Sequence, residues 1–317
     1  MTPHHLARTF NVDGSPWHAN KEGVYGIHLD SFLRYLSLAW TDYYNYDFVV
    51  YFRKHKESPP KFPNRRPRTI LIYLADEFAT IPTEISRSFF AILKSYWPFP
   101  DQQNNIISFP HGYGNCITEL CSVPFEKRTV DCFFSGYFNY NRLDLFRSFS
   151  CYRWLPPFPL NSVFARRVYW HLLRKTGLYQ PGWRRTGDKM EIYFTPSFAD
   201  GLTHKAYASH LANSRIVLCP RGHVSAESFR LFEAASVGCV VISDPLPQSH
   251  WYQNAPYITC HDWLNIRRTV HELCADDAHL HELHRATVNW WQKRLSDKPA
   301  AEYVARCLQA LKDEPIR

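Results

Sequence analysis

Residues 219–244, CPRGHVSAESFRLFEAASVGCVVISD, combine charged side chains with the pattern of a strand, a loop, a helix and a second strand. The apolar run before Arg221 predicts a strand that ends at Pro220, and the following helix is expected to begin near Ser225 or Ala226. The first N–H groups of a helix lack intrahelical partners, and the helix dipole adds about half a positive charge at that end. The segment therefore predicts an anion site that suits a diphosphate.

Arginine and glutamate side chains extend this predicted site. Arg221 and Arg230 offer forked guanidinium donors that match phosphate oxygens. Glu233 follows Arg230 by three residues, so the two share a helix face, where the carboxylate could accept hydrogen bonds from two neighbouring ribose hydroxyls. Phosphate and ribose together indicate a nucleotide. The alternative is a surface ion pair between Arg230 and Glu233, worth roughly a few tenths of a kcal/mol.

The same segment resembles the signature of exostosin-like glycosyltransferases, in which a strand ending in C/P-R-G precedes S-x-R-x-x-E-A and then a G-C-x-x-V-x strand. The spacing of Tyr207, Leu211 and Ser214 and the pair Asp262-Trp263 are also similar to that family. The resemblance is specific in this region and faint elsewhere. It implies a GT-B fold, in which two Rossmann-like domains face each other across a cleft, with the nucleotide-sugar donor on the C-terminal domain and the acceptor on the N-terminal one.

The resemblance also implies which residues hold the donor. It places Arg230 at the diphosphate and Glu233 at the ribose, and the whole set from the opening segment is Arg221, Gly222, Ser228, Arg230 and Glu233. Gly136 in FSGYFN resembles a glycine turn that lets a donor phosphate approach the first helix of the second domain. Arg142 and Lys205 could reach the same phosphates, or each could be an ordinary surface cation.

Transfer of a sugar with inversion needs a base for the acceptor hydroxyl and positive surroundings for the departing diphosphate. Arginines and a helix dipole can supply the second role, so no metal cofactor is expected. Ends of strands in the first domain are the predicted places for the base, and the candidates are Asp76 and Glu77 after TILIYLA, and His111 in PHGYGN. Alternatively, Asp76 and Glu77 cap a helix near Pro82 or lie in solvent, and His111 lies in a turn or lines the acceptor site.

The anomeric outcome does not follow from the glutamates of the opening segment. Glu227 and Glu233 are six residues apart, whereas many retaining GT-B enzymes have an E-x7-E pattern. We expect inversion, with the donor nucleotide and sugar left open and a CMP-linked acidic sugar among the options. A zinc site is not expected, because the following residues lack the two tight ligand pairs of such sites: Cys260, His261, His271, Cys274, His279, His281 and His284.

Alternating strands and helices must position these residues. In the first third the pattern predicts a helix at 27–40, strands at 46–52 and 69–75, a helix at about 83–96 and a strand at 105–109. After Thr129 it predicts a new strand followed by a glycine turn at Ser135-Gly136, then helices at 164–177, 202–214 and 226–238, strands at 190–195, 215–220, 239–244 and 256–260, and a mainly helical tail. Such alternation predicts α/β domains with parallel sheets covered on both faces.

The restart of the pattern sets the expected domains. Residues 1–127 form the predicted N-terminal Rossmann-like acceptor-side domain, and residues 128–297 form the predicted C-terminal nucleotide-sugar-binding domain. Residues 298–317 are expected to form a C-terminal helix that could cross back to the first domain, as in related transferases.

Composition limits the classes of protein that the chain can represent. Its 317 residues are 45% hydrophobic and 21% charged, which indicates a globular protein rather than a disordered one. The sequence shows no secretory signal and no apolar run long enough to span a bilayer, so we expect a cytoplasmic location, as in a bacterial version of the family. A formal net charge of +8 favours anionic partners.

Two regions leave the partner open. The basic aromatic segment at 164–177, FARRVYWHLLRKTG, could rest on an anionic membrane surface, or it could be an ordinary helix packed on the core. The leading function is a glycosyltransferase in polysaccharide or lipopolysaccharide-type synthesis, with a saccharide or lipid-linked glycan as acceptor. One alternative is a non-catalytic sugar-binding scaffold. The other is a nucleic-acid-binding protein, which the positive net charge and the basic segment RKHKESPPKFPNRRPR at 53–68 suggest. No known nucleic-acid-binding signature is present, so nucleic acid is not an expected partner.

Overall fold

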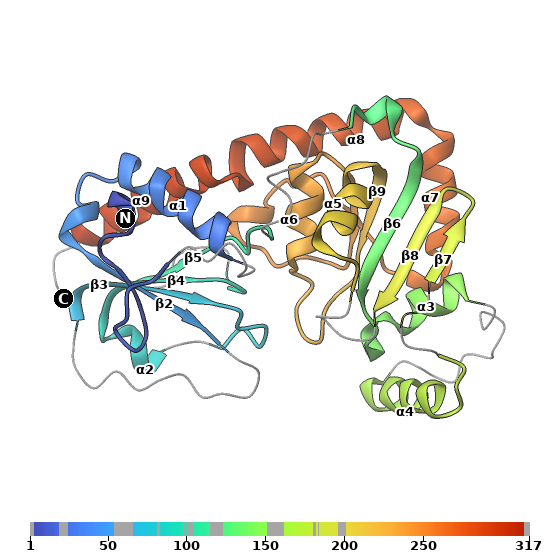
Figure 1. Cartoon of the computed structure of the whole chain (residues 1–317), viewed down its shortest axis with the longest axis horizontal. Helices are drawn as coiled ribbons and strands as arrows, with labels where there is room; N and C mark the ends of the chain where they lie inside the picture. The colour runs from blue at the N-terminus through green and yellow to red at the C-terminus, as the bar shows by residue number, and fades with distance from the viewer. Residues whose placement is uncertain are drawn as a thin grey trace. The chain divides into compact units, whose positions relative to one another are not determined.

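The chain divides into two compact units, which are coloured by residue number in the computed structural model of Figure 1. Unit 1 comprises Met1–Asn115, Pro247–Ala255 and Trp291–Arg317, and unit 2 comprises Cys116–Leu246 and Pro256–Trp290. The structure describes residues 3–18, 25–53, 66–80, 83–97, 99, 104–114, 123–150, 162–179, 182, 184–195 and 201–313. Residues 123–127, which the sequence placed in the first domain, belong to unit 2.

Unit 1 is built on a parallel five-stranded sheet whose strands follow their order in the chain. The strands are β1 (Thr9–Asn11), β2 (Asp47–Phe52), β3 (Arg66–Leu74), β4 (Phe89–Lys94) and β5 (Ile106–Ser108). Its α-helices are α1 (Gly26–Ala39), α2 (Thr83–Ser86) and α9 (Asp297–Asp313). Short 3-10 helices form η1 (His4–Leu6), η2 (Tyr43–Asn45) and η6 (His250–Tyr252), and η8 (Trp291–Leu295) is a π-helix that leads into α9.

Apolar periodicity explains how α1 covers the sheet. Leu29, Phe32, Leu33 and Leu36 recur at helical spacing and are completely buried. Helix α1 packs against α9, so the C-terminal helix belongs to unit 1, and the two helices lie together over the sheet in Figure 1.

One element of unit 1 differs from the sequence-based expectation. The helix predicted at about 83–96 is wrong, because only Thr83–Ser86 is helical and Phe89–Lys94 forms strand β4. This strand lies between β3 and β5 and is buried on both faces, so it reads as an unbroken apolar run. Periodicity alone does not separate such a strand from a buried helix.

Unit 2 is built on a six-stranded sheet with the order β11-β10-β9-β6-β8-β7. The strands are β6 (Val130–Tyr137), β7 (Arg184–Gly187), β8 (Met190–Thr195), β9 (Ser214–Cys219), β10 (Val240–Ser243) and β11 (Ile258–Thr259), and only β7 pairs antiparallel. The helices are α3 (Leu143–Phe149), α4 (Val163–Lys175), α5 (His204–Ala212), α6 (Phe229–Ser236), α7 (Ile266–Ala275) and α8 (Asp277–Trp290), with η3 (Phe125–Lys127), η4 (Tyr140–Arg142) and η7 (Trp263–Asn265) between them.

Both faces of the unit 2 sheet are covered. Phe134 packs in a core cluster that includes residues of α3 and α7, whereas its neighbour Phe133 contacts Tyr207 and His210 of α5. The predicted α/β class is confirmed, because each of the two units is built on a parallel or mainly parallel sheet. The GT-B arrangement itself stays a prediction. The cleft that we expected between the two domains stays a prediction.

None of the helices in the described residues is both long enough and apolar enough to cross a membrane.

Candidate nucleotide-binding site and acceptor-side residues

The predicted donor residues gather at one edge of the unit 2 sheet. Strands β6, β9 and β10 run parallel, so their carboxyl ends, at Tyr137, Cys219 and Ser243, share one edge. The loop from Pro220 to Ser228 leaves β9 at this edge and leads into α6. Open α/β sheets bind ligands outside the carboxyl ends of their strands.

Helix α6 begins later than the sequence predicted. Its N-cap is Ser228, with φ −158° and ψ 156°, rather than a residue near 225. The Gly222 N–H donates to the Ser225 carbonyl over 2.8 Å, and the Glu227 N–H donates to Ser225 Oγ over 3.1 Å, so these residues form a turn instead of helix. The Ser228 hydroxyl is buried and has no hydrogen-bond partner within the described part of the chain.

Arg230 lies in the first turn of α6 and contacts the end of β6. Its Nε donates to the Ser135 carbonyl over 3.0 Å, and its guanidinium lies 4.8 Å from the Phe134 ring centroid. Its Nη1 is buried, and no described residue accepts a hydrogen bond from it. Two buried donors at the start of α6, Arg230 Nη1 and Ser228 Oγ, are therefore left without acceptors among the described residues. A buried donor of this kind normally has a partner.

Gly136 explains how Arg230 comes so close to the strand. The predicted glycine turn is wrong, because Gly136 lies within β6 and pairs with Phe194 of β8. A Cβ at this position would lie 2.4 Å from Arg230 Nη2 and 3.0 Å from Arg142 Nη1. The absence of a side chain therefore lets two guanidinium groups approach the strand backbone together.

Arg142 fixes the loop that precedes α6. Its side chain is 7% exposed; Nη1 donates to the Tyr137 carbonyl over 2.6 Å, and Nε donates to the Arg221 carbonyl over 3.1 Å. On the other side of the loop, the Arg221 N–H donates to Asp244 Oδ2 over 2.7 Å, and Trp263 Nε1 donates to the same oxygen over 3.1 Å. The loop is thus held by Arg142 of η4 on one side and by Asp244, directly after β10, on the other, and Trp263 of η7 fixes that carboxylate.

Glu233 lies deeper on α6 and is 6% exposed. The Tyr207 hydroxyl of α5 donates to its Oε2 over 2.6 Å, and burial together with the adjacent Glu233 charge raises the pKa of Tyr207. No ion pair joins Arg230 and Glu233 in the described residues, so the surface-pair alternative is not what the structure contains. The sequence singled out Tyr207 only for its spacing before Leu211 and Ser214 and did not predict its hydrogen bond to Glu233.

The remaining predicted donor residues differ in their surroundings. Arg221, the second residue of the loop, is exposed, and Gly222 is half-buried within the loop, with its carbonyl accepting from Asn141 Nδ2 over 2.7 Å. Lys205 is exposed on α5, and none of the described hydrogen bonds or ion pairs links it to the other predicted residues. The structure therefore brings together Gly136, Arg142 and Arg230 and does not join Lys205 to them.

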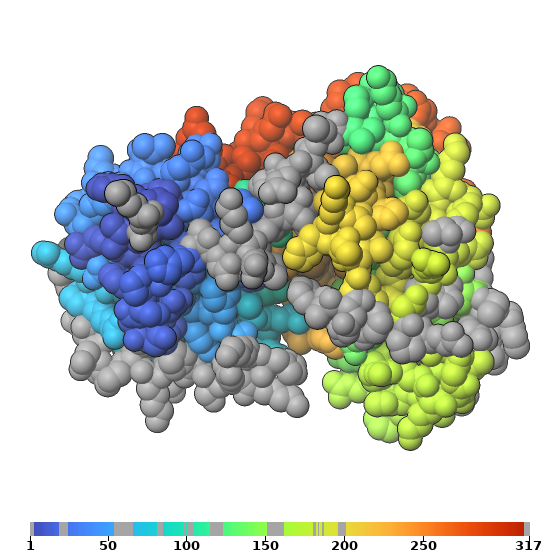
Figure 2. All heavy atoms as spheres, in the orientation of Figure 1, coloured from blue at the N-terminus to red at the C-terminus, as the bar shows by residue number. Residues whose placement is uncertain are grey.

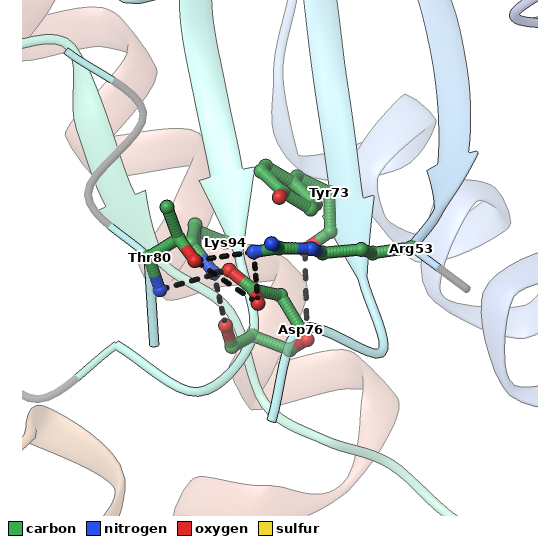
Figure 3. Close-up of polar contacts among 6 residues, drawn as sticks. Arg53, Tyr73, Asp76, Thr80 and Lys94 are labelled. Carbon is green, nitrogen blue, oxygen red and sulfur yellow. Dashed lines mark hydrogen bonds and ion pairs between the residues drawn. The ribbon is translucent and has the colours of Figure 1, made fainter. Parts of the chain in front are cut away.

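In unit 1, Asp76 follows β3 at the carboxyl edge of the sheet. It is completely buried, and Figure 3 shows it between two cations: Arg53 Nη1 lies 2.7 Å from Oδ1 and Lys94 Nζ lies 2.9 Å from Oδ2. The Thr80 N–H also donates to Oδ2 over 2.9 Å. Asp76 is completely buried, so the alternative in which it lies in solvent is wrong. The alternative in which it caps a helix near Pro82 stays untested, because residues 81–82 lie outside the described residues.

The backbone around Asp76 is held in an uncommon conformation. Ala75 has φ 61° and Ala79 has φ 50°, values that L-residues rarely adopt and that cluster at functional sites. Glu77, the second predicted base, lies between them and is half-buried. Of the two carboxylates, Asp76 has both oxygens engaged by cations, whereas Glu77 retains contact with solvent.

His111 lies in the loop after β5 and is 2% exposed. Its Nε2 lies 3.0 Å from the Tyr96 hydroxyl, and its ring meets Tyr25 edge-on with centroids 6.0 Å apart. Burial, with a further contribution from His28, lowers the pKa of His111 to about 3. The imidazole is therefore neutral at physiological pH, which leaves it able to accept a proton but makes it a weak base.

A second polar cluster in unit 1 was not found from the sequence. His28 Nδ1 of α1 lies 2.8 Å from Asp297 Oδ1 of α9, and the Tyr113 hydroxyl donates to Asp297 Oδ2 over 2.6 Å. Burial acts to raise the pKa of Asp297, but the hydrogen bond and charge of His28 hold it below its usual range. A Cβ on Gly112, which has φ 76°, would lie 2.2 Å from the His28 ring. Gly112 and Tyr113 thus link α1 to the start of α9.

Among the described residues, no group of three His, Cys, Asp or Glu side chains is placed to hold a metal ion. In the sequence cluster considered for zinc, His284 Nδ1 lies 2.6 Å from the Gly238 carbonyl, and its ring stacks on Phe125 with centroids 4.2 Å apart. This histidine therefore packs α8 against its neighbours. Metal independence itself stays a prediction.

No model of a known protein family matches the chain, and no curated protein matches its sequence. The chain is similar to the solved structure of sucrose-phosphate synthase from Thermosynechococcus elongatus at 13% identity and a TM-score of 0.35, over 77% of this chain and 58% of that one. It is also similar to a co-structure of S. aureus MnaA with UDP at 10% identity and a TM-score of 0.39, over 93% of this chain and 82% of that one. At these values membership of the exostosin-like family stays a prediction, and the chain spans less than two thirds of the synthase.

Proposed function

We propose that the protein is a glycosyltransferase whose unit 2 binds a nucleotide-sugar donor. The proposal rests on two buried donors at the start of α6, Arg230 Nη1 and Ser228 Oγ. No described residue accepts a hydrogen bond from either of them. An anionic ligand would satisfy both, and it would do so where the helix dipole is positive. A diphosphate fits this demand, because it presents several acceptor oxygens and a full negative charge.

The surrounding contacts support a departing nucleoside diphosphate. Arg230 is held by the Ser135 carbonyl, and Gly136 leaves the space that it occupies, so its guanidinium needs little reorganisation to bind an oxyanion. Exposed Arg221 adds a second guanidinium beside it in the proposed complex. We propose that Glu233, oriented by Tyr207, accepts from a ribose hydroxyl.

Unit 1 supplies the proposed acceptor side. Asp76 would lose two ion-pair contacts on accepting a proton, and His111 is a weak base in its buried setting, so we assign the base to Glu77. Its carboxylate would take the proton of an acceptor hydroxyl that attacks the anomeric carbon, while the C–O bond to the diphosphate breaks and the pair of electrons leaves with the phosphate. The proposed reaction inverts the anomeric centre and uses no metal, and the expected GT-B arrangement would bring the two edges together.

The proposed biological context is synthesis of a polysaccharide or lipopolysaccharide-type glycan, with a saccharide or lipid-linked glycan as acceptor. The chain's net positive charge of +8 suits anionic glycans and glycolipids of this kind.

A thermal-shift panel of UDP, GDP, CMP, ADP and TDP tests the donor site. One nucleotide should raise the unfolding temperature by several degrees through linkage, and Arg230→Ala should abolish that rise. Arg285→Ala, an exposed arginine of α8, is the matched control and should keep it. The corresponding nucleotide-sugar should be hydrolysed slowly by the wild type, and loss of this turnover in Glu77→Gln with binding retained would support the assigned base. Binding without any turnover would indicate a sugar-binding scaffold instead.

A further inference from the structure

Helix α4 of unit 2 presents an apolar row to solvent. Phe164, Val168 and Leu172 recur every four residues, so they line up along one side of the helix, and their exposed fractions are 77%, 44% and 53%. Figure 1 shows α4 at the margin of unit 2, and Figure 2 shows it at the surface there. Three large apolar side chains in one exposed row form a patch, rather than the single exposed residues that are normal on protein surfaces.

A basic row lies beside the apolar row. Arg167, His171 and Lys175 are also four residues apart, each three residues after a member of the apolar row, and all three are exposed. The sequence of α4 contains no Asp or Glu, and Arg174 adds another exposed cation in its last turn. Within the described part of the chain, none of these basic side chains makes an ion pair; Arg167 lies 5.1 Å from the Tyr140 ring centroid instead.

The opposite side of α4 attaches the helix to unit 2. Leu173 is 2% exposed, and Tyr169 and Trp170 pack against the core cluster of this unit. Arg166 is also turned to the protein, because its Nη2 lies 3.3 Å from Asp144 Oδ2. The apolar row is thus not the face by which α4 packs on unit 2. Packing on the core explains the apolar residues of the opposite side only and leaves Phe164, Val168 and Leu172 unexplained.

We propose that the outer side of α4 docks on an anionic lipid bilayer, with the apolar row in the interfacial region and the basic row on lipid phosphates. A helix that combines these two faces lies in the plane of a membrane interface. Charge complementarity selects anionic lipids, because basic side chains near such a surface are attracted to it. A nucleic acid would satisfy the cations but would leave Phe164, Val168 and Leu172 in water, so lipid accounts for both rows. This surface is independent of the proposed donor site.

Co-sedimentation of the full chain with vesicles tests this surface. The chain should bind vesicles of phosphatidylcholine with one third phosphatidylglycerol at low salt, bind less at high salt, and bind vesicles of pure phosphatidylcholine weakly. Phe164→Ser/Leu172→Ser and Arg167→Gln/Lys175→Gln should each weaken the partition coefficient by about tenfold or more. Phe164→Leu should retain binding, because it keeps an apolar side chain in the row.

Matched substitutions elsewhere serve as controls. Leu38→Ser removes an apolar side chain that is 79% exposed on α1, and Arg268→Gln/Arg285→Gln removes two exposed cations from α7 and α8. Both should bind vesicles as the wild type does, and every variant should keep its thermal unfolding midpoint. Equal binding of the α4 variants and the wild type would overturn the proposal. So would retention on single-stranded RNA that depends on Arg167 and Lys175 but not on Phe164 and Leu172.

Discussion

Gly136→Ala offers a sharp test of the geometry at the donor site. The added Cβ would lie 2.4 Å from Arg230 Nη2 and 3.0 Å from Arg142 Nη1, whereas ordinary contacts of a Cβ begin at 3.4 Å. Arg142 is held by backbone carbonyls, so the Arg230 guanidinium must move by about 1 Å to relieve the first contact. That shift would misalign its hydrogen bonds to a phosphate, each worth about 1.5–3 kcal/mol when a charge takes part.

The expected result is a nucleotide dissociation constant about ten to a hundred times higher than that of the wild type. Isothermal titration calorimetry with the nucleotide that gives the largest thermal shift measures it. Gly201→Ala is the control: the nearest atom to its Cβ would be Thr195 Cγ2 at 3.4 Å, an ordinary contact, so its affinity should stay unchanged.

A double variant separates this explanation from a general loss of stability. If Gly136 acts through the arginine, Gly136→Ala should add little to the affinity loss of Arg230→Ala, so the two effects should be strongly non-additive. Wild-type affinity in Gly136→Ala would refute the reasoning, as would additive losses in the double variant.

Three further predictions concern stability and the residues around the two sites. Since folded His111 has a pKa of about 3 against 6.5 for the unfolded chain, the free energy of unfolding should fall by about 1.4 kcal/mol per pH unit as pH drops from 6.5 toward 3, and urea titrations of His111→Gln should lose that slope. Tyr207→Phe removes the hydroxyl that donates to the buried Glu233 carboxylate and should lower the free energy of unfolding by about 1–3 kcal/mol in urea titrations. An unchanged free energy of unfolding would mean that this hydrogen bond does not stabilise the fold. Lys94→Met removes one of the cations that pair with buried Asp76 and should cost about 3–5 kcal/mol in the same urea titration; a loss below about 1 kcal/mol would contradict this account of Asp76.

The strands and helices followed from the sequence where periodicity was clear. The strand predicted at 190–195 matches Met190–Thr195 of β8, and the helix predicted at 164–177 closely matches α4 (Val163–Lys175). Strand β4 was missed because a strand buried on both faces has no alternation to reveal it. Helix α6 was placed too early, because the turn at Ser225 depends on hydrogen bonds that composition does not show.

The site followed from the sequence only in part. The anion-binding pattern marked Arg230, and the structure adds that its Nη1 lacks a protein acceptor in the described region. The sequence predicted a turn at Gly136. It could not show that Gly136 lies against two arginines, because tertiary packing brings Arg142 and Arg230 to this position. Asp76 could not be recognised as an ion-pair centre, since Arg53, directly after β2, and Lys94, the last residue of β4, lie 23 and 18 residues away from it in the chain. The contact between His28 and Asp297 joins opposite ends of the chain, beyond the reach of local patterns.

A diffraction structure with the stabilising nucleoside diphosphate tests the central claim most directly. The account predicts phosphate oxygens within hydrogen-bond distance of both Arg230 Nη1 and Ser228 Oγ, at the start of α6. A diphosphate bound elsewhere, with Arg230 Nη1 donating to a protein carbonyl instead, would contradict it.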